Sequence, residues 1–235
     1  MRSPLWIVCC GGLFLTSLST GWAFAEGDSS DAETALRQLF PRFEVTAVHP
    51  TPVESLFEVV AGENVLYFAA ATGHLLFGEL WSKEGVSLTA ARKERLLAEK
   101  VARLPLDRAV RIGFGPTVVI EVTDPDCPFC RMGSDYLKTR SDVTRYVFFH
   151  PLPSHPQARA KTRYILAASD PAGAYAEVFA GCYDEGSLPE SPPTDRLEEH
   201  LRLVEGLGVR GTPHYWIGGE HVAGADLDAI RNLLP

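Results

Sequence analysis

Two cysteines separated by two residues, Cys127 and Cys130, are the side chains whose types and spacing most directly imply chemistry. Pro128 suits the first position of a helix, because its ring sets φ and the amide proton it lacks is one that a helix leaves free. Cys127 is then the N-cap, where free backbone N–H groups and the helix dipole favour the thiolate over the thiol. Cys130 lies one turn further in, close enough to attack a mixed disulfide formed at Cys127. The pair therefore predicts thiol–disulfide exchange.

The same cysteine spacing also occurs in zinc sites and in structural disulfides. A structural zinc ion needs four ligands, and only Cys182 and seven histidines scattered along the chain are available to complete such a set. We therefore expect no metal and no bound cofactor. An inert structural disulfide stays open as an alternative.

Charged residues surround this motif. Glu121 lies in the middle of an apolar run that leads into it. Burial would favour the protonated form of that carboxyl group, which could then pass on the proton that Cys130 must lose. The alternative is a glutamate at the strand edge whose carboxylate reaches solvent. Asp124 and Asp126 oppose thiolate formation at the nucleophile, whereas Arg131 supports it.

A second motif lies far downstream, where Gly211–Pro213 stands directly before the apolar run 214–217. A proline can open a strand at the edge or end of a sheet. His214 follows this proline, and the alternation of a strand turns its side chain away from the cysteines. His150 and His155 lie in a proline-rich loop, where we expect surface roles rather than catalysis.

The first part of the chain predicts a small α+β unit. A capping box, Ser30-x-x-Glu33, opens a helix that Pro41 stops. A unit over residues 26–88 is near the lower size limit for a self-sufficient core, so we expect it to gain buried area from a partner subunit. The expected elements are a helix over 31–40 and strands over 43–48, 56–60, 65–70 and 75–80.

Residues 89–104 contain neither glycine nor proline and predict a helix, which Pro105 follows. Its faces are mostly charged, with a narrow apolar stripe. A largely polar helix between two folded units is typical of a solvent-exposed connector. The alternative is an ordinary surface helix of one domain.

After Pro105 the pattern changes to alternating strands and helices. A Cys-x-x-Cys that follows a strand and opens a helix in this setting indicates redox chemistry. The fold class is therefore a small α+β unit followed by an α/β unit. The expected strands of the second unit are 109–114, 117–123, 144–149 and 214–217, with a hairpin at 218–219, and the expected helices are 128–139, 157–169, 172–180, 194–207 and 226–234.

The N-terminus predicts a secretory signal peptide over residues 1–25. Arg2 is a short basic region, residues 5–18 are mostly apolar, and Ala23–Ala25 is a small-x-small site for cleavage after Ala25. A transmembrane anchor is the alternative, but glycine, threonine and serine interrupt the apolar stretch. It is shorter than the ~20 apolar residues that a span needs.

Composition narrows the function classes. The formal charge of −8 argues against nucleic acid as a partner. Cleavage after Ala25 would leave three cysteines, Cys127, Cys130 and Cys182. An exported protein with so few cysteines is not a disulfide-stapled scaffold, and an odd number leaves at least one thiol unpaired within the chain.

Taken together, the small α+β unit, the helical linker, the Asp-Pro-x-Cys-Pro-aromatic-Cys stretch at 124–130 and the Gly-Thr-Pro resemble the DsbC/DsbG family of periplasmic disulfide isomerases. The resemblance implies a thioredoxin-like catalytic domain over 105–235, an N-terminal dimerisation domain over 26–88 and a linker helix over 89–104. It also implies that the Thr212–Pro213 bond is cis and that both residues form part of the substrate site beside the cysteines.

The same resemblance implies partners and a location. The protein would be a periplasmic homodimer that acts on unfolded or misoxidised exported proteins and is kept reduced by a membrane thiol reductase of the DsbD type. Pro128 and Phe129 are more similar to the DsbG branch, for which reduction of sulfenic acids is also proposed, and the unmatched Cys182 favours the same branch. Two alternatives stay open: a DsbA-like dithiol oxidase, and a chaperone-like binding module with secondary redox activity.

Overall fold

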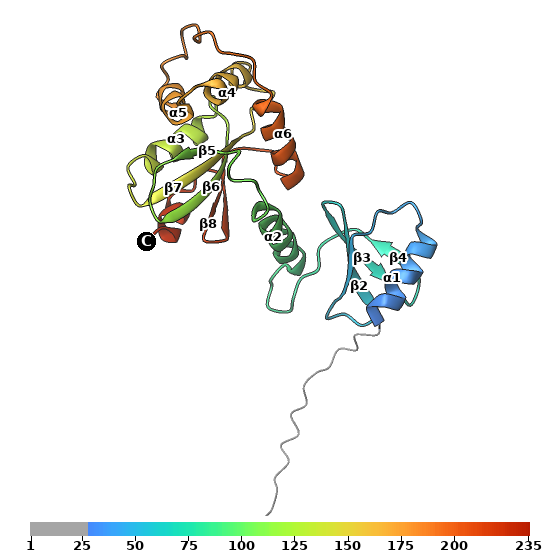
Figure 1. Ribbon diagram of the computed structural model, residues 1–235. Coiled ribbons are helices and arrows are strands. Elements are labelled where there is room, and N and C mark those ends of the chain that lie inside the picture. The colour runs from blue at the N-terminus through green and yellow to red at the C-terminus, as the bar shows by residue number, and fades with distance from the viewer. Residues whose placement is uncertain (1–27) are drawn as a thin grey trace, which may run out of the picture. The chain divides into compact units, whose positions relative to one another are not determined.

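The computed structural model describes residues 28–235, which form two compact units (Figure 1). One unit contains the residues up to Gly62 together with Leu66–Leu76, and the other contains Glu63–Val65 and Phe77–Pro235. The predicted signal peptide lies outside the described residues. Within residues 28–235, none of the helices has both the length and the apolar character needed to cross a bilayer.

The N-terminal unit is one helix packed on a four-stranded antiparallel sheet with the order β1-β2-β3-β4. Leu36 of the helix and Val59 and Phe68 of the sheet are fully buried and form the centre of its core. The elements are α1 (Asp28–Leu39), β1 (Ala47–Pro50), β2 (Leu56–Ala61), β3 (Asn64–Ala69) and β4 (His74–Leu76).

The elements of this unit differ in part from the sequence-based expectation: the strand predicted over 75–80 is β4, which already ends at Leu76. The predicted capping box is wrong, because Ser30 already lies inside α1 and Glu33 forms an ion pair with Arg37 at 2.7 Å. The strand predicted from residue 43 begins only at Ala47, because the backbone N–H of Phe43 bonds to the oxygen of Phe40 in a turn.

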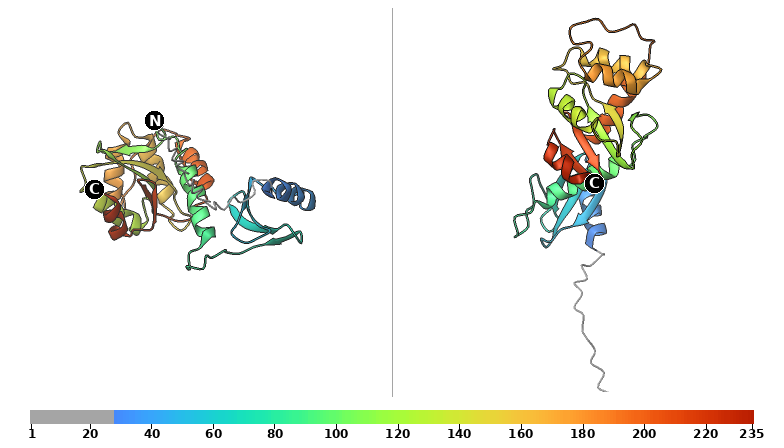
Figure 2. Two further views of the ribbon diagram at one scale, coloured as in Figure 1. Left: turned by 90° about the horizontal axis from the view of Figure 1, so that it is seen from below. Right: turned by 90° about the vertical axis from the view of Figure 1, so that its left-hand side faces the viewer.

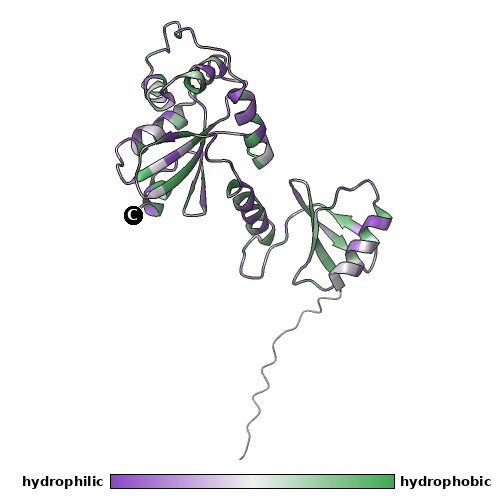
Figure 3. Ribbon diagram, in the orientation of Figure 1, coloured by the Kyte–Doolittle hydropathy of each residue, from purple (hydrophilic) through white to green (hydrophobic). Residues whose placement is uncertain are grey.

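Helix α2 (Leu88–Val101) belongs to the larger unit. Its N-cap is Ser87, whose side chain accepts a hydrogen bond from the backbone N–H of Ala90. Val101, and Leu104 just beyond the helix, are buried in a cluster with Phe148 and Trp216. The helix lies beside α6 (Arg196–Leu207) (Figure 2), and its residues are largely hydrophilic (Figure 3). The assignment of this helix as a linker between two domains stays a prediction, as do the boundaries at 88 and 104.

The larger unit is built on a five-stranded sheet with the order β5-β7-β6-β8-β9. The neighbouring strands β6 and β7 run parallel and are joined through a helix, and the other pairs are antiparallel. The strands are β5 (Val110–Ile112), β6 (Thr117–Thr123), β7 (Val143–Phe149), β8 (His214–Ile217) and β9 (Glu220–Ala223).

Helices cover both faces of this sheet, and the alternation along each strand decides which side chain meets which helix. Val122 of β6 and Trp216 of β8 pack with α2 and α6. Val119 of β6 and Tyr215 of β8 pack on the opposite side. The predicted fold class is confirmed. The remaining helices are α3 (Pro128–Leu137), α4 (Ala158–Ala167), α5 (Pro171–Phe179) and α7 (Leu227–Leu233).

Candidate functional site

The two motif cysteines lie at the start of α3, directly after the central strand β6. Cys127 is the N-cap of α3, with φ −75° and ψ 121°, and Pro128 occupies the first helical turn. Both predictions about this helix start are confirmed. Cys127 is 4% exposed and Cys130 is fully buried, so Cys127 is the more accessible of the two residues.

The two thiols have opposite acidities. A hydrogen bond from the Cys130 thiol, supported by the backbone N–H groups of Cys130 and Phe129, lowers the pKa of Cys127 to about 5 despite partial burial. Burial raises the pKa of Cys130 well above its ordinary value. Cys127 is therefore the thiolate at neutral pH, and Cys130 keeps its proton.

The second motif meets the first in space. The Thr212–Pro213 bond is cis, as predicted. In the thiol form, Sγ of Cys127 donates to the backbone oxygen of Thr212 at a distance of 3.6 Å. The antiparallel pairing of Val122 with His214 places this segment at the end of β6 from which the helix α3 starts. The backbone at Thr212 thus lies beside the reactive sulfur. A backbone segment of this kind can pair with an extended peptide.

Cys130 is enclosed by the end of β6. The backbone N–H of Asp124 lies 3.4 Å from its sulfur. The hydroxyl of Thr123 also acts on this thiol and lowers its pKa, against the larger effect of burial. A buried sulfur surrounded by donors is suited to the role of a thiol that ionises only when it attacks a mixed disulfide.

Glu121 is fully buried, and its carboxylate is ion-paired with an arginine of β7. Oε2 accepts hydrogen bonds from Nε and a terminal nitrogen of Arg145 at 3.0 and 2.7 Å. The hydroxyl of Tyr175 lies 2.6 Å from Arg145 and 3.0 Å from Ser134, which closes a polar network below α3. This ion pair was missed from the sequence. An arginine inside the apolar run of β7 was the available signal, because a buried arginine needs a carboxylate partner.

Asp124 orients a histidine that sequence reasoning had assigned to the surface. The side chain of Asp124 is fully buried and accepts from the backbone N–H groups of Asp126 and Leu152 at 2.8 and 2.7 Å. Its Oδ2 also contacts Nδ1 of His155 at 2.8 Å. This hydrogen bond raises the pKa of His155, and the negative charges of Cys127 and Asp126 act in the same direction.

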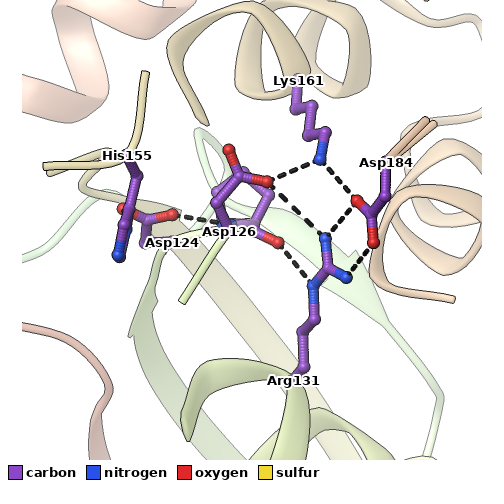
Figure 4. Close-up of polar contacts among 7 residues, drawn as sticks. Asp124, Asp126, Arg131, His155, Lys161 and Asp184 are labelled. Atoms are coloured by element: carbon purple, nitrogen blue, oxygen red, sulfur yellow. Dashed lines mark hydrogen bonds and ion pairs between the residues drawn. The ribbon is translucent and has the colours of Figure 1, made fainter. Parts of the chain in front are cut away.

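A second charged cluster lies on the other side of Asp126 (Figure 4). Lys161 is nearly fully buried, and its Nζ contacts Asp126 and Asp184 at 2.6 Å each. Arg131 forms a two-point ion pair with Asp184 and also donates to the backbone oxygen of Pro125 at 2.8 Å. These pairs neutralise the carboxylate of Asp126 next to the nucleophile, which the sequence had left as an opposing charge.

The remaining candidates lie apart from the cysteines. His214 contacts His221 at 2.9 Å and stacks on Trp216, on the face of the sheet covered by α2. Cys182 is exposed in the turn after α5 and has no disulfide partner among the described residues. The same part of the chain contains no group of three or more histidine, cysteine, aspartate or glutamate side chains placed to hold a metal ion.

Two family models match the chain and together cover most of it. The N-terminal domain of disulfide bond isomerase proteins matches residues 23–90. A thioredoxin-like domain matches residues 105–226, the part that contains both halves of the site.

Curated proteins of known class are similar over much of the chain. A probable thiol:disulfide interchange protein DsbC of Bordetella parapertussis is 35% identical over 193 residues, which is 80% of this chain and 67% of that protein. The thiol:disulfide interchange protein DsbG of Pseudomonas aeruginosa is 26% identical over 63% of each chain. A crystal structure of a disulfide interchange protein from Neisseria gonorrhoeae is 28% identical and covers 55% of this chain and 97% of its own, with a TM-score of 0.46.

Proposed function

Since the chain belongs to the DsbC/DsbG family of thiol:disulfide interchange proteins, we propose that Cys127 is the nucleophile and Cys130 the resolving thiol of its exchange reaction. The protein is a thiol–disulfide oxidoreductase with a thioredoxin-like domain. The observation that carries the assignment of roles is the contrast between the two thiols. Cys127 caps α3 with a pKa of about 5, whereas Cys130 is buried and protonated.

The first step is attack by the Cys127 thiolate on one sulfur of a substrate disulfide. A bond forms between Sγ of Cys127 and that sulfur, the substrate S–S bond breaks, and the departing sulfur takes up a proton. The backbone of Thr212 lies beside Cys127, so the substrate segment next to the attacked cysteine would pair with this part of the chain.

Two routes complete the reaction. In isomerisation, a second thiolate of the substrate attacks the substrate sulfur that is bonded to Cys127. A new substrate disulfide forms, and Cys127 leaves as a thiolate. In reduction, Cys130 loses its proton and attacks Cys127, which leaves a Cys127–Cys130 disulfide and a reduced substrate. Return to the dithiol then needs an external reductant, for which a membrane thiol reductase of the DsbD type is the expected partner.

The proposal extends to substrates, assembly and location. Unfolded or misoxidised exported proteins are the expected substrates, and the periplasm is the expected compartment. The isomerase-type N-terminal domain at residues 23–90 supports a homodimer formed through that unit. Two subunits would then present two cysteine pairs to one misfolded chain.

Catalytic refolding of scrambled ribonuclease tests this function. We expect Cys127→Ser to abolish it and Cys130→Ser to retain part of the isomerase activity while losing insulin reduction, because only reduction requires the resolving thiol. Cys182→Ser, a substitution of an exposed thiol outside the site, serves as the matched control and should keep both activities. Full isomerase activity in Cys127→Ser would refute the proposed nucleophile.

A further inference from the structure

A hollow of about 380 Å³ lies beside the start of α3. His155, Asp126 and Pro128 line it, and Pro128 is the residue directly after the nucleophile. The imidazole of His155 is partly exposed, at 23%, while its partner Asp124 is fully buried. The histidine therefore stands between a fixed carboxylate and the solvent next to the site.

Asp124 also connects this histidine to both cysteines through its backbone. Its N–H lies 3.4 Å from Sγ of Cys130, and its carbonyl oxygen accepts from the N–H of Cys127 at 3.2 Å. Its side chain contacts Nδ1 of His155. When the imidazole is protonated, Asp124 therefore does not engage the proton on Nε2, which can go to another acceptor. Asp124 thus contacts both cysteines and the imidazole, and it fixes their positions relative to one another.

The charges around His155 favour its protonated form. The hydrogen bond with Asp124 raises its pKa, burial opposes this, and the charges of Asp124, Cys127 and Asp126 add to the increase. Lys161 lines the same hollow, but it is ion-paired to Asp126 and Asp184. His150 is also within the field of Asp124, but burial lowers its pKa and keeps it neutral.

On the basis of the proposed function, we propose that His155 is a further catalytic residue, which protonates the sulfur that leaves the substrate when Cys127 attacks. Sγ of Cys127 bonds to one substrate sulfur, the substrate S–S bond breaks, and the electron pair stays on the departing sulfur. Nε2–H of His155 gives its proton to that sulfur, so the product is a thiol and the imidazole becomes neutral. The partly exposed ring then regains a proton from solvent.

Leaving-group dependence tests this role in the protein without residues 1–25 and with Cys130→Ser and Cys182→Ser, so that Cys127 is its one remaining cysteine. The probes are two neutral disulfides. 2-Hydroxyethyl disulfide expels an alkyl thiolate, whose sulfur needs a proton. 4,4′-Dithiodipyridine instead expels pyridine-4-thiolate, whose charge is delocalised onto the ring nitrogen, so its sulfur needs no proton and the nitrogen later takes one from solvent. After correction for the thiolate fraction, His155→Gln should slow the first reaction about tenfold or more and the second less than about twofold. Imidazole added to His155→Ala should restore part of the first rate.

Arg159→Gln is the matched control, because it removes a positive charge from the neighbouring helix, where Arg159 faces Glu198. It should change neither rate. Equal slowing of both disulfides by His155→Gln, or no slowing of either, would overturn the assignment. If Cys127→Ser abolishes refolding activity while His155→Gln leaves the alkyl disulfide rate unchanged, the proposed function stands and only the role of His155 fails.

Discussion

Sγ of Cys127 and the backbone oxygen of Thr212 lie 3.6 Å apart, although 85 residues separate them along the chain. The contact exists because β6, which leads into the cysteine motif, pairs with β8, which Pro213 precedes. Attack by Cys127 and docking of the substrate backbone therefore take place at the same site.

Alkylation should distinguish the two thiols. In the reduced protein with Cys182→Ser, iodoacetamide at pH 6 should label Cys127 much faster than Cys130, because the pKa of Cys127 is about 5 while Cys130 is buried and stays protonated. The rate at Cys127 should rise with pH through about 5 and then level off. Mass spectrometry of the labelled peptides gives both rates, and preferential labelling of Cys130 would reverse the assignment.

The stability of the reduced protein should depend on pH through Cys127. Its pKa is lowered from about 9 to about 5 on folding, so the folded state is the stronger acid. Ionisation then contributes stability that is fully present above pH 9 and is lost progressively as the pH falls towards 5. Urea unfolding of the reduced protein at several pH values measures this, and Cys127→Ser should remove that part of the pH dependence. An unchanged profile in Cys127→Ser would mean that the thiolate is not stabilised by the fold.

Thr123→Val should slow resolution by Cys130. The Thr123 hydroxyl is buried without a hydrogen-bond partner among the described residues, and it lowers the pKa of the Cys130 thiol. Valine has nearly the same shape but no hydroxyl, so the attacking thiolate loses a donor and the mixed disulfide with glutathione should persist several-fold longer. Thr162→Val is the control, since the Thr162 hydroxyl is also buried without a partner but lies on α4. Equal lifetimes in the wild type and Thr123→Val would exclude this role.

Glu121→Gln should lower stability rather than the rate of exchange. It leaves the buried guanidinium of Arg145 without a carboxylate partner, and breaking a buried pair in this way costs about 3–5 kcal/mol. Glu33→Gln is the control, because its pair with Arg37 is exposed and is worth about 0–1 kcal/mol. Denaturant unfolding and insulin reduction per folded molecule should be measured together. A large loss of activity with unchanged stability would contradict this prediction and support the proton-relay role that the sequence suggested.

Much of the site could be predicted locally. The cysteine spacing, the fit of Pro128 to a helix start and the Gly-Thr-Pro before a strand are short-range signals, and each depends on the backbone preferences of a few adjacent residues. They were sufficient for the N-cap at Cys127, and the family resemblance added the cis bond at Pro213. Strands β6 and β8 were also predicted to the residue, because an apolar run bounded by turn residues marks a buried strand clearly.

Tertiary structure alone decided how the charged side chains are paired. Glu121 meets Arg145 only because β6 and β7 lie side by side in the sheet, and Asp124 meets His155 only because the loop after β7 folds back towards α3. Likewise, whether the polar helix α2 stands free or packs depends on the apolar surface around Trp216 that other segments provide. A sequence shows which side chains must find a partner when buried, but the partner comes from whichever strand or loop the fold brings within a few ångströms.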